Sequence, residues 1–530
     1  SYKGIEADAD RIANGFHIVD DFPEEAVSVN EKEIVVKDSK GNLVTGLKST
    51  VYKTLTDAPK GVQESLKSAG YTPKGSIQVL TAENPTEFYN KYVRTGDVLT
   101  ITNPMTVRKE MLGKIAEYKN TAYQLDFGLA MVTETTVNKV VKPSPKKANF
   151  NKVGVNIDGK QVFAGSTNYY HVTADYSQYK GIQADKSRIA QGFFIADDYP
   201  EDVLDVLSDG IKLSDSKGQD VKGLKYHVYE SIEKAPEVLR KALTERGFKP
   251  KGAFQVWEAE NPAEFYAKYV QTGDTITIIN PMKVKEKFSK TGGKYENTAY
   301  QVDFGVAEVT VTVVNNIPKL QTKKDVVIKV GDTESKDGKE IVLGQKFFYS
   351  FDGSLITANR AEDLFEYKFV DDYQETHDRF DGVYKVIAKK DFKTSDGKTF
   401  KKGDDLTSYS FLKEDKTKGK LEVGLKEEFL RSITNDSEFQ AEVFVEMTRI
   451  KSGEVENKQT HVVNGIEVES NTVKTTTPEP PKTPETPTPK PQTPAKKVLP
   501  NTGAEASVLG IVMAGITSAL GAIGLKRKRD

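Results

Sequence analysis

The sequence predicts a mainly β protein with three tandem β-sandwich domains and short helical insertions, then a proline-rich stalk and a C-terminal apolar helix. Three observations predict this: a long internal repeat, strands in which apolar and polar residues alternate, and an abrupt change of composition near residue 475. At ~100–200 residues per domain, 530 residues suffice for three domains and a tail.

The repeat defines the domains. The segment from Tyr2 to Asn138 aligns without a gap to Tyr179–Asn315, at a constant offset of 177 residues. Roughly half of the aligned positions are identical, which predicts two copies of one domain. We expect a first domain over 1–141, truncated at its N-terminus; a second over 142–317; and a third, more distant one over 318–474. The chain is expected to be the C-terminal part of a longer precursor.

The elements within these domains follow from local patterns. Alternating apolar residues at Phe439–Met447 predict a strand. Asn261 followed by Pro262 predicts a helix start, with the helix running to about Val270. A second helix is expected from Ala235 to Arg246, and the capping-box spacing at Asn359–Glu362 predicts a third helix start.

The tail has three parts. Thr475–Lys497 holds eight prolines, which favour an extended polyproline II stalk over residues 475–498. Residues 506–525 are uncharged and long enough to span a bilayer, and the basic residues 526–530 should stay cytoplasmic.

A short motif precedes the apolar segment: Leu499, Pro500, Asn501, Thr502 and Gly503. This LPxTG motif, the apolar span and the basic tail together resemble the sorting signal of Gram-positive cell-wall proteins. The resemblance implies that sortase cuts after Thr502 and joins its carboxyl group to peptidoglycan. We therefore expect a secreted protein that is covalently anchored to the cell wall and inserted in the membrane only before sorting.

Composition excludes several function classes. The formal net charge of −1 argues against a nucleic-acid-binding protein. The lack of cysteine excludes disulfides, cysteine-ligated zinc and thiol nucleophiles. The five histidines form no HExxH signature, and the sequence has neither a GxSxG elbow nor a P-loop. We therefore do not expect an enzyme, apart from autocatalysis.

Polar residues recur at positions that should face each core. They sit two residues from an apolar neighbour, and side chains at i and i+2 share a strand face. Each full domain should bring together a lysine from its start, an aspartate from its middle and an asparagine from its end. The sets are Lys147, Asp197 and Asn315 in the second domain, and Lys324, Asp371 and Asn471 in the third.

Burial would give this triple a chemistry. A desolvated lysine shifts toward the neutral amine and a desolvated aspartate toward the protonated acid. The amine can attack the asparagine side-chain carbonyl while the aspartate shuttles protons, so that loss of ammonia leaves a Lys–Asn amide. By analogy with disulfides, closing most of a domain contributes ~4–5 kcal/mol.

Several choices stay open at this stage. The neighbouring residues Lys146, Lys323, Asn316 and Asp198 compete with the chosen ones. The first-domain equivalents are Asp20 and Asn138, and no lysine for them is visible in the sequence.

Residues 145–200 and 259–282, together with the LPNTG end, resemble the C-terminal domains of the streptococcal antigen I/II adhesins. The resemblance covers residues 1 to about 474. It implies immunoglobulin-like, two-sheet folds of the variant type, intramolecular Lys–Asn isopeptide bonds, and a cell-wall adhesin. The partners that it implies are host salivary or matrix glycoproteins, or surface proteins of other bacteria.

One adherence motif of such relatives can be followed residue by residue. Leu239 and Leu243 occupy two apolar places of a VxxLL-like helix, and Ala242 occupies another. The stretch that follows departs from the NITVK-like strand and includes Lys249 and Lys251. Adherence through Leu239, Leu243, Lys249 and Lys251 competes with the simpler interpretation that the helix packs on its own sandwich.

No cofactor should be required. The acidic loops 215–220 and 391–396 are candidate sites for a structural Ca²⁺ ion, although no EF-hand spacing occurs there. Two other functions compete with this one. A pilin-like structural subunit would need a YPK-like donor motif, which the sequence lacks, and no motif supports a surface glycan hydrolase.

Overall fold

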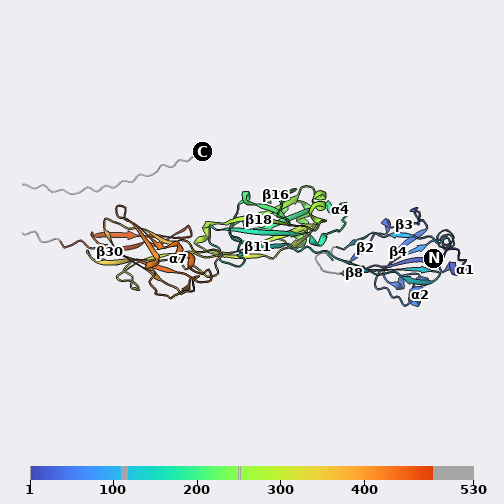
Figure 1. Ribbon diagram of the computed structural model, residues 1–530, viewed down its shortest axis with the longest axis horizontal. Helices are drawn as coiled ribbons and strands as arrows, with labels where there is room; N and C mark the ends of the chain where they lie inside the picture. Colours follow the sequence, from blue (N-terminus) through green and yellow to red (C-terminus); the bar gives the residue numbers. More distant parts are fainter. Residues whose placement is uncertain (1, 109–110, 112–116, 249, 251, 482–530) are drawn as a thin grey trace, which may run out of the picture. The chain divides into compact units, whose positions relative to one another are not determined.

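The computed structural model describes residues 2–108, 111, 117–248, 250 and 252–481 (Figure 1). The described chain is mainly β, as predicted, with short helices between strands. The predicted stalk beyond residue 481, the sorting motif, the apolar span and the basic tail lie outside the described residues. Within the described part, no helix is long and apolar enough to cross a membrane.

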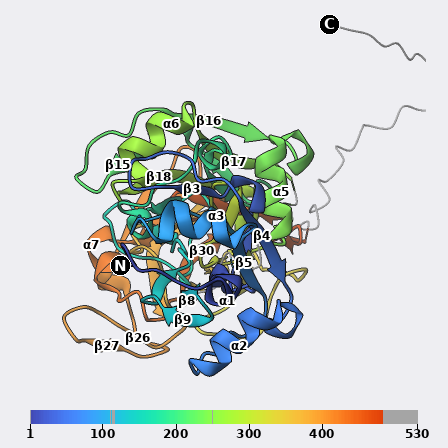
Figure 2. The same cartoon turned by 90° about the vertical axis from the view of Figure 1, so that its right-hand side faces the viewer.

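The first copy has one main sheet with the strand order β10-β8-β1-β5-β4, and β9 also pairs with β8. Helix α2 covers one face of this sheet, where its Val62 and Leu66 pack against Ile77 and Val79 of β5 (Figure 2). Two small ribbons, β2–β7 and β3–β6, complete the copy. Its elements are α1 (Ala9–Ala13), β1 (Phe16–Asp21), β2 (Val27–Val29), β3 (Val35–Lys37), β4 (Leu47–Tyr52), α2 (Lys60–Ser68), β5 (Ile77–Ala82), α3 (Pro85–Phe88), β6 (Thr100–Thr102), β7 (Met105–Val107), β8 (Glu117–Asp126), β9 (Leu129–Val132) and β10 (Thr136–Lys139).

The second copy has two sheets. One has the order β11-β12-β18-β14, with β15 also on β18; the other has the order β16-β17-β13-β19-β20, with β21 also on β19. Its elements are β11 (Lys146–Phe150), β12 (Thr167–Asp175), α4 (Lys186–Ile189), β13 (Phe193–Asp198), β14 (Leu204–Val206), β15 (Lys212–Asp215), β16 (Leu224–Tyr229), α5 (Glu237–Glu245), β17 (Phe254–Ala259), α6 (Pro262–Phe265), β18 (Thr275–Val284), β19 (Gly293–Asp303), β20 (Val306–Val309) and β21 (Val313–Ile317).

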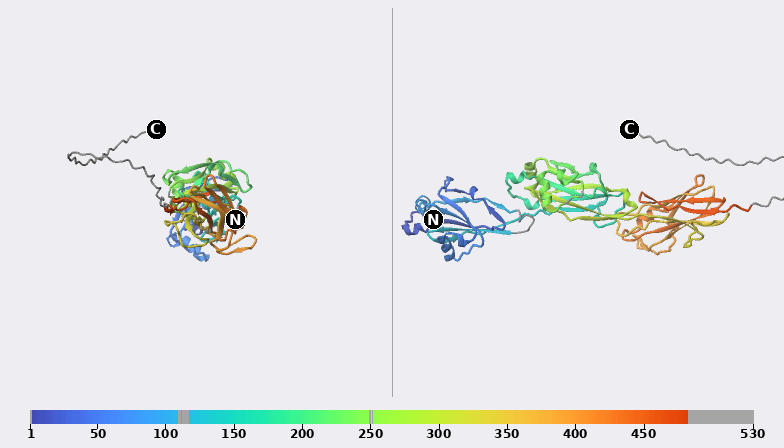
Figure 3. Two further views of the ribbon diagram at one scale, coloured as in Figure 1. Left: turned by 90° about the vertical axis from the view of Figure 1, so that its left-hand side faces the viewer. Right: turned by 180° about the vertical axis from the view of Figure 1, so that it is seen from behind.

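The third region, coloured yellow to red in Figure 3, repeats this plan. Its sheets have the strand orders β22-β23-β30-β25 and β28-β29-β24-β32-β33. The pairs β26–β27 and β31–β34 lie beside them. The elements are β22 (Lys323–Val327), β23 (Lys346–Asp352), β24 (Tyr367–Asp372), β25 (Asp378–Ala388), β26 (Phe392–Lys393), β27 (Thr399–Phe400), β28 (Ser410–Asp415), β29 (Lys420–Leu425), α7 (Glu427–Ser432), β30 (Ala441–Arg449), β31 (Gly453–Asn457), β32 (Gln459–Val463), β33 (Ile466–Glu469) and β34 (Val473–Thr477).

The cores lie between the paired sheets. In the second copy, Val172 of β12 and Ile278 of β18 pack against Ile195 of β13 in the facing sheet. Strand β12 alternates buried and half-buried positions along its whole length. This alternation is the expected result of one strand face turning to the core.

Two of the three predicted helices are present. Asn261 caps α6 with its side chain, and a single π turn continues the helix through Val270, as predicted. Helix α5 ends one residue before the predicted Arg246. The helix start predicted at Asn359 is wrong, because Asn359 adopts a left-handed conformation with φ of 59° and no helix follows it in the described structure.

Candidate cross-linking sites

The site in the second copy joins its two sheets. Lys147 lies on β11, and its Nζ donates hydrogen bonds to Oδ1 of Asp197 on β13 and to Oδ1 of Asn297 on β19. The distance from Nζ to the Asn297 oxygen is 2.6 Å. Strands β13 and β19 are paired neighbours in the sheet that faces β11, which brings Asp197 and Asn297 side by side.

Burial dominates the electrostatics of this site. The Lys147, Asp197 and Asn297 side chains are all buried. Loss of solvent lowers the pKa of Lys147, and the Asp197 charge opposes that shift only in part. The aromatic ring of Tyr170 lies 5.2 Å from Nζ and excludes water from one side. A buried lysine with a lowered pKa is closer to the nucleophilic free amine.

A polar pair behind the aspartate holds it in place. Asn280 of β18 donates one hydrogen bond of 3.3 Å to Oδ2 of Asp197 and another of 2.7 Å to Oε1 of Gln255. Both side chains are fully buried. Oδ1 of Asp197 is therefore left for the lysine amine.

The third region repeats the arrangement. Lys324 on β22 donates to Oδ1 of Asp371 on β24, and Asn457 at the end of β31 donates to Oδ2 of the same carboxylate at 3.3 Å. The lysine and asparagine side chains therefore converge on one aspartate. The carbonyl oxygen of the Asn457 side chain is buried and has no hydrogen-bond partner.

The pKa values in this site move toward neutral groups. Burial lowers the pKa of Lys324 to about 8, against the opposing effect of Asp371. Burial also raises the pKa of Asp371. The rings of Tyr349 and Phe351 lie 4.4 and 4.7 Å from Nζ of Lys324. This pair can therefore exchange its proton and present a free amine to the neighbouring amide.

The structure decides between the adjacent candidates. Lys147 and Lys324 point inward and are buried, whereas Lys146 and Lys323 are exposed. Asp197 and Asp371 likewise contact the lysines. The predicted lysines and aspartates are thus brought together.

The predicted asparagine of the second copy is not the one at the amine. Asn315 is buried, as the pattern required, but it accepts a hydrogen bond from Nδ2 of Asn149 and donates to the backbone oxygens of Ile157 and Lys160. Strand β21 pairs with β19 so that Asn315 lies opposite Tyr295. The placement of Asn315 beside Lys147 is therefore wrong, because Asn297 occupies that place on the neighbouring strand.

The third region needs the same correction. Asn471 is exposed and binds the backbone of Lys324 rather than its amine, with its Oδ1 accepting from the Lys324 N–H and its Nδ2 donating to the Lys324 carbonyl. Asn457 takes the core position instead. The prediction placed the asparagine on the last strand, whereas it lies on the strand that β34 pairs with.

The first copy keeps part of the site. Asp20 lies on β1, and Asn103 donates to its Oδ2 at 3.0 Å. The predicted Asn138 is exposed on β10, opposite Tyr118, and cannot serve as the buried partner. Asn120, the counterpart of Asn297, lies close enough to Asp20 to lower its pKa, although burial raises that pKa overall.

Sequence reasoning missed Asn297 and Asn457, but a signal was present. Both follow a glutamate, Glu296 and Glu456. Both also have buried residues two positions away on either side. The NTAYQ stretch that starts at Asn297 recurs in the first copy at Asn120. A cross-link between the chain ends would close the largest loop, and this argument favours an asparagine on the terminal strand instead.

The predicted adherence helix does not expose its leucines. Leu239 and Leu243 on α5 are fully buried against Phe254 and Val256, so they cannot contact a partner. The competing interpretation, packing on its own sandwich, is correct for these two residues. Lys249 and Lys251 lie outside the described residues.

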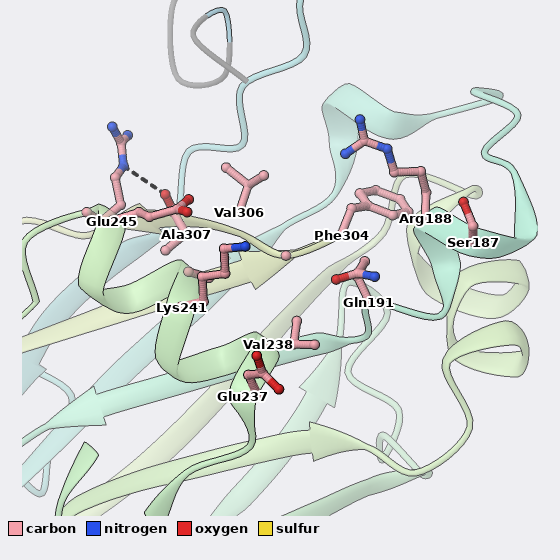
Figure 4. A pocket seen from close by; sticks show the side chains of 13 residues that line it. Ser187, Arg188, Gln191, Glu237, Val238, Lys241, Glu245, Phe304, Val306 and Ala307 are labelled. Atoms are coloured by element: carbon pink, nitrogen blue, oxygen red, sulfur yellow. Dashed lines mark hydrogen bonds between the residues drawn. The ribbon is translucent and has the colours of Figure 1, made fainter. Parts of the chain in front are cut away.

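The other face of α5 borders a cavity of about 590 Å³. Glu237, Lys241 and Glu245 lie on this exposed face, across from the turn that carries Phe304 (Figure 4). Charged groups of both signs therefore line the hollow, which is a feature of polar surfaces rather than of apolar docking grooves.

The acidic loops act as turns. Asp215 accepts the backbone N–H groups of Lys217 and Gln219, and Asp391 accepts the backbone N–H of Lys402 and pairs with Lys401. Among the residues that the structure describes, no group of three or more acidic or histidine side chains is arranged to hold a metal ion.

Comparisons with known families cover nearly the whole chain. The model described as cell surface antigen I/II C2 terminal domain matches residues 1–140 and 145–317. The model described as cell surface antigen C-terminus matches residues 321–478, and the LPXTG cell wall anchor motif matches residues 491–530.

Individual relatives agree. The C-terminal domain of the antigen I/II-family protein AspA of Streptococcus pyogenes is 36% identical with a TM-score of 0.59, over 63% of this chain and 99% of that structure. The C-terminal domain of the Streptococcus agalactiae antigen I/II polypeptide BspA is 34% identical with a TM-score of 0.56, again over 63% and 99%. Aggregation substance of Enterococcus faecalis is 32% identical over 73% of this chain, which spans only 30% of that protein.

Proposed function

Because the chain belongs to the cell surface antigen I/II family and carries its cell-wall anchor motif, we propose that it is an adhesin stalk stapled by Lys–Asn isopeptide bonds. Family membership makes it a secreted, wall-anchored surface protein of a Gram-positive bacterium. The observation that carries the rest of the proposal is the contact of the buried Lys147 with both Asp197 and Asn297, which are buried as well.

The reaction would start with a proton transfer. Lys147 and Asp197 share a hydrogen bond, so the lysine proton passes to the carboxylate and leaves a neutral amine and a neutral acid. Burial lowers the pKa of Lys147, which favours loss of its proton. The resulting amine lies in contact with the amide group that it must attack.

The next steps form the bond. The Nζ lone pair attacks Cγ of Asn297, and the protonated Asp197 stabilises the carbonyl oxygen as negative charge develops there. Asp197 then delivers its proton to the amide nitrogen, which departs as ammonia, and takes up the proton that the attacking nitrogen loses. One C–N bond forms and one breaks, and neither an oxidant nor a cofactor is consumed.

The third region supports the same reaction from the leaving-group side. Asp371 contacts the nitrogen of Asn457 that would depart, and it also contacts the lysine amine. A protonated Asp371 is thus placed to deliver its proton to that nitrogen.

The staple would give the stalk mechanical strength. In the second copy it would close a loop between residues 150 positions apart. Loop-closure arguments developed for disulfides give about 4–5 kcal/mol for loops of this length. A force applied to the two ends of the domain could then not extend the residues between the linked positions.

Intact-mass spectrometry of the 530-residue chain tests the proposal. Two isopeptide bonds should lower the mass by about 34 Da, because each releases one ammonia of about 17 Da. A mass equal to that of the unmodified sequence would refute the staples while leaving the wall anchor untouched.

Anchoring and adhesion complete the proposal. Sortase would cleave after Thr502 and join that residue to peptidoglycan. The stapled stalk would then hold host glycoproteins, or surface proteins of other bacteria, at a distance from the wall. Binding of beads coated with the chain to immobilised salivary glycoprotein or to bacterial cells would test this step, and beads that bind neither would refute it.

A further inference from the structure

The third region has a second polar contact between its two sheets, beside the lysine site. Nε2 of Gln459, at the start of β32, lies 2.6 Å from Oγ1 of Thr322, which immediately precedes β22. The two residues are 137 positions apart in the sequence, and Gln459 is buried. Strands β22 and β32 belong to different sheets, so this contact crosses the sandwich, as the contact of Lys324 with Asp371 does.

The second copy carries other side chains at these two places. Asp371 lies opposite Gln459 where β24 pairs with β32, and the aspartate of the second copy lies opposite Ala299. Thr322 precedes the buried lysine of its region by two residues, and Pro145 takes that place in the second copy. The third region thus has a hydroxyl group and a carboxamide where the second copy has neither.

The hydroxyl group of Thr322 is oriented as a nucleophile. Oγ1 donates its proton in a hydrogen bond of 2.7 Å to the backbone oxygen of Asp352. A lone pair of Oγ1 therefore faces the amide group of Gln459, which donates to it. The amide carbon is bonded directly to Nε2, so it lies one covalent bond beyond the contact.

The carbonyl oxygen of the glutamine has no role in this hydrogen bond. Oε1 of Gln459 is buried and has no hydrogen-bond partner in the described structure, which destabilises the folded chain. Oδ1 of Asn457, in the neighbouring lysine site, has the same property. Both carboxamides are held through their nitrogen atoms, by Thr322 and by Asp371. Gln459 is therefore placed like the amide that would react with Lys324.

The proposed isopeptide reaction would leave an acid next to this amide. The ammonium group of Lys324 has three protons, of which one stays on the new amide and one leaves with the ammonia. The third remains on Asp371, and burial raises the pKa of that carboxyl group. Side chains directly opposite each other in an antiparallel pair have Cβ atoms about 4.5–5.5 Å apart, so the acid lies beside Gln459.

We propose that Thr322 and Gln459 form an intramolecular ester bond, after the isopeptide bond and beside it. This inference rests on the proposed function, because the isopeptide reaction supplies the acid. Oγ1 attacks Cδ of Gln459, and Asp371 gives its proton to Nε2, which leaves as ammonia. Asp371 takes up the proton of the hydroxyl group in return. One C–O bond forms and one C–N bond breaks, and neither an oxidant nor a cofactor is consumed.

The ester should form more slowly than the isopeptide bonds. A threonine hydroxyl group is a weak nucleophile at its ordinary pKa, whereas a desolvated lysine is close to the free amine. The freshly purified chain should therefore show the loss of about 34 Da from the two isopeptide bonds. On prolonged incubation in neutral buffer, the loss should grow to about 51 Da, because a third ammonia is released.

Tandem mass spectrometry of a tryptic digest locates the third loss. Trypsin cleaves after Lys323 and Lys458, so the ester and the isopeptide bond fall in separate branched peptides. The incubated chain should yield residues 320–323 joined to residues 459–474, about 17 Da lighter than their sum. Dilute alkali should separate these two peptides and leave the isopeptide-linked peptides intact, because hydroxide opens esters far faster than amides.

Three variants of the full chain complete the design. Thr322→Val removes the hydroxyl group at nearly the same size, so this chain should keep the loss of about 34 Da and never reach about 51 Da. Thr322→Ser should restore the third loss, because it keeps the nucleophile. Gln440→Ala, at a glutamine of the same region that donates to Asp352, should leave the third loss unchanged.

The outcomes separate the two hypotheses. A loss that stays at about 34 Da shows that the pair is an ordinary hydrogen bond, and it overturns the inference alone. A third loss that persists in Thr322→Val, such as a cyclic imide at Asn464 before Gly465, overturns it as well. If the fresh chain shows no loss, the proposed function fails. An ester in the incubated chain would then still support the bond, and its absence would overturn it.

Discussion

Nζ of Lys147 lies 2.6 Å from Oδ1 of Asn297, although the two residues are 150 positions apart in the sequence. This contact crosses the sandwich from β11 to β19, and the same Nζ also pairs with Asp197. The buried lysine, carboxylate and amide would be costly as separate groups. Conversion of the lysine and the amide into one neutral link removes that cost.

The first prediction is that Asn297 is the asparagine that becomes linked to Lys147. Asn297→Ala should reduce the mass loss of the chain from about 34 to about 17 Da, because only the third-region bond can then form. The melting temperature should fall as well, since the loop is no longer closed. Mass spectrometry and thermal unfolding check the two effects.

Asn315→Ala is the matched control, because Asn315 is equally buried in the same copy. It should leave the mass loss at about 34 Da but should cost ~1–3 kcal/mol of stability, since Asn149 and the carbonyl groups of Ile157 and Lys160 lose a buried partner. If Asn315→Ala instead abolished the isopeptide bond of the second copy, Asn315 and not Asn297 would be the linked asparagine.

Asp371 should be required for the bond in the third region. Asp371→Ala removes the group that exchanges protons with Lys324 and contacts the departing nitrogen of Asn457. The mass loss should drop to about 17 Da. Asp372→Ala, at the exposed neighbour, should keep both bonds. Equal masses for the two variants would argue against a catalytic aspartate.

The free lysine should make stability depend on pH. In Asn457→Ala no bond can form, and burial holds the pKa of Lys324 at about 8, below its ordinary value of 10.5. Between these two values the unfolded chain binds more protons than the folded chain. The free energy of unfolding should therefore rise with pH across this window, while below about pH 8 the cost of burying the charge is fully present.

Urea unfolding at pH 7.5 and pH 10 would measure this dependence. The reference is the double variant Lys324→Met/Asn457→Ala, which lacks the amine and should show less of the rise. If the difference between the two variants stays constant from one pH to the other, the lysine is not held in a low-pKa state.

A second buried ion pair secures the last strand of the third region. Arg449 donates to Asp378 and to the hydroxyl groups of Thr475 and Thr477 on β34. Arg449→Ala leaves the buried Asp378 carboxylate without its cation and should lower the free energy of unfolding by ~3–5 kcal/mol. Arg379→Ala removes an exposed side chain from Asp381, which keeps its contacts with Lys346 and Thr448, and should cost ~0–1 kcal/mol. Similar losses for both variants in urea unfolding would contradict this role.

Much of the fold followed from the sequence, because the repeat and the strand alternation are local patterns. The inward lysines and aspartates were also predictable, since an apolar neighbour two residues away fixes which face of a strand is buried. The start of α6 at Pro262 was predictable from its cap. By contrast, the start expected at Asn359 failed, because the spacing of a capping box does not by itself supply a helix.

The correct asparagines could not be chosen by alternation alone. Asn315 and Asn297 are both fully buried, and only the pairing of β21 beside β19 decides which one reaches the amine. Register between distant strands is a tertiary property that a local pattern does not contain. The prediction that Leu239 and Leu243 contact a partner failed for a related reason, since an apolar stripe on a helix predicts burial as readily as binding.

The most direct measurement is peptide mapping of the protease-digested chain by tandem mass spectrometry. The account predicts two branched peptides, one joining Lys147 to Asn297 and one joining Lys324 to Asn457, each about 17 Da lighter than the sum of its parts. Linear peptides that carry these lysines and asparagines unmodified, or branches that end at Asn315 or Asn471, would contradict it.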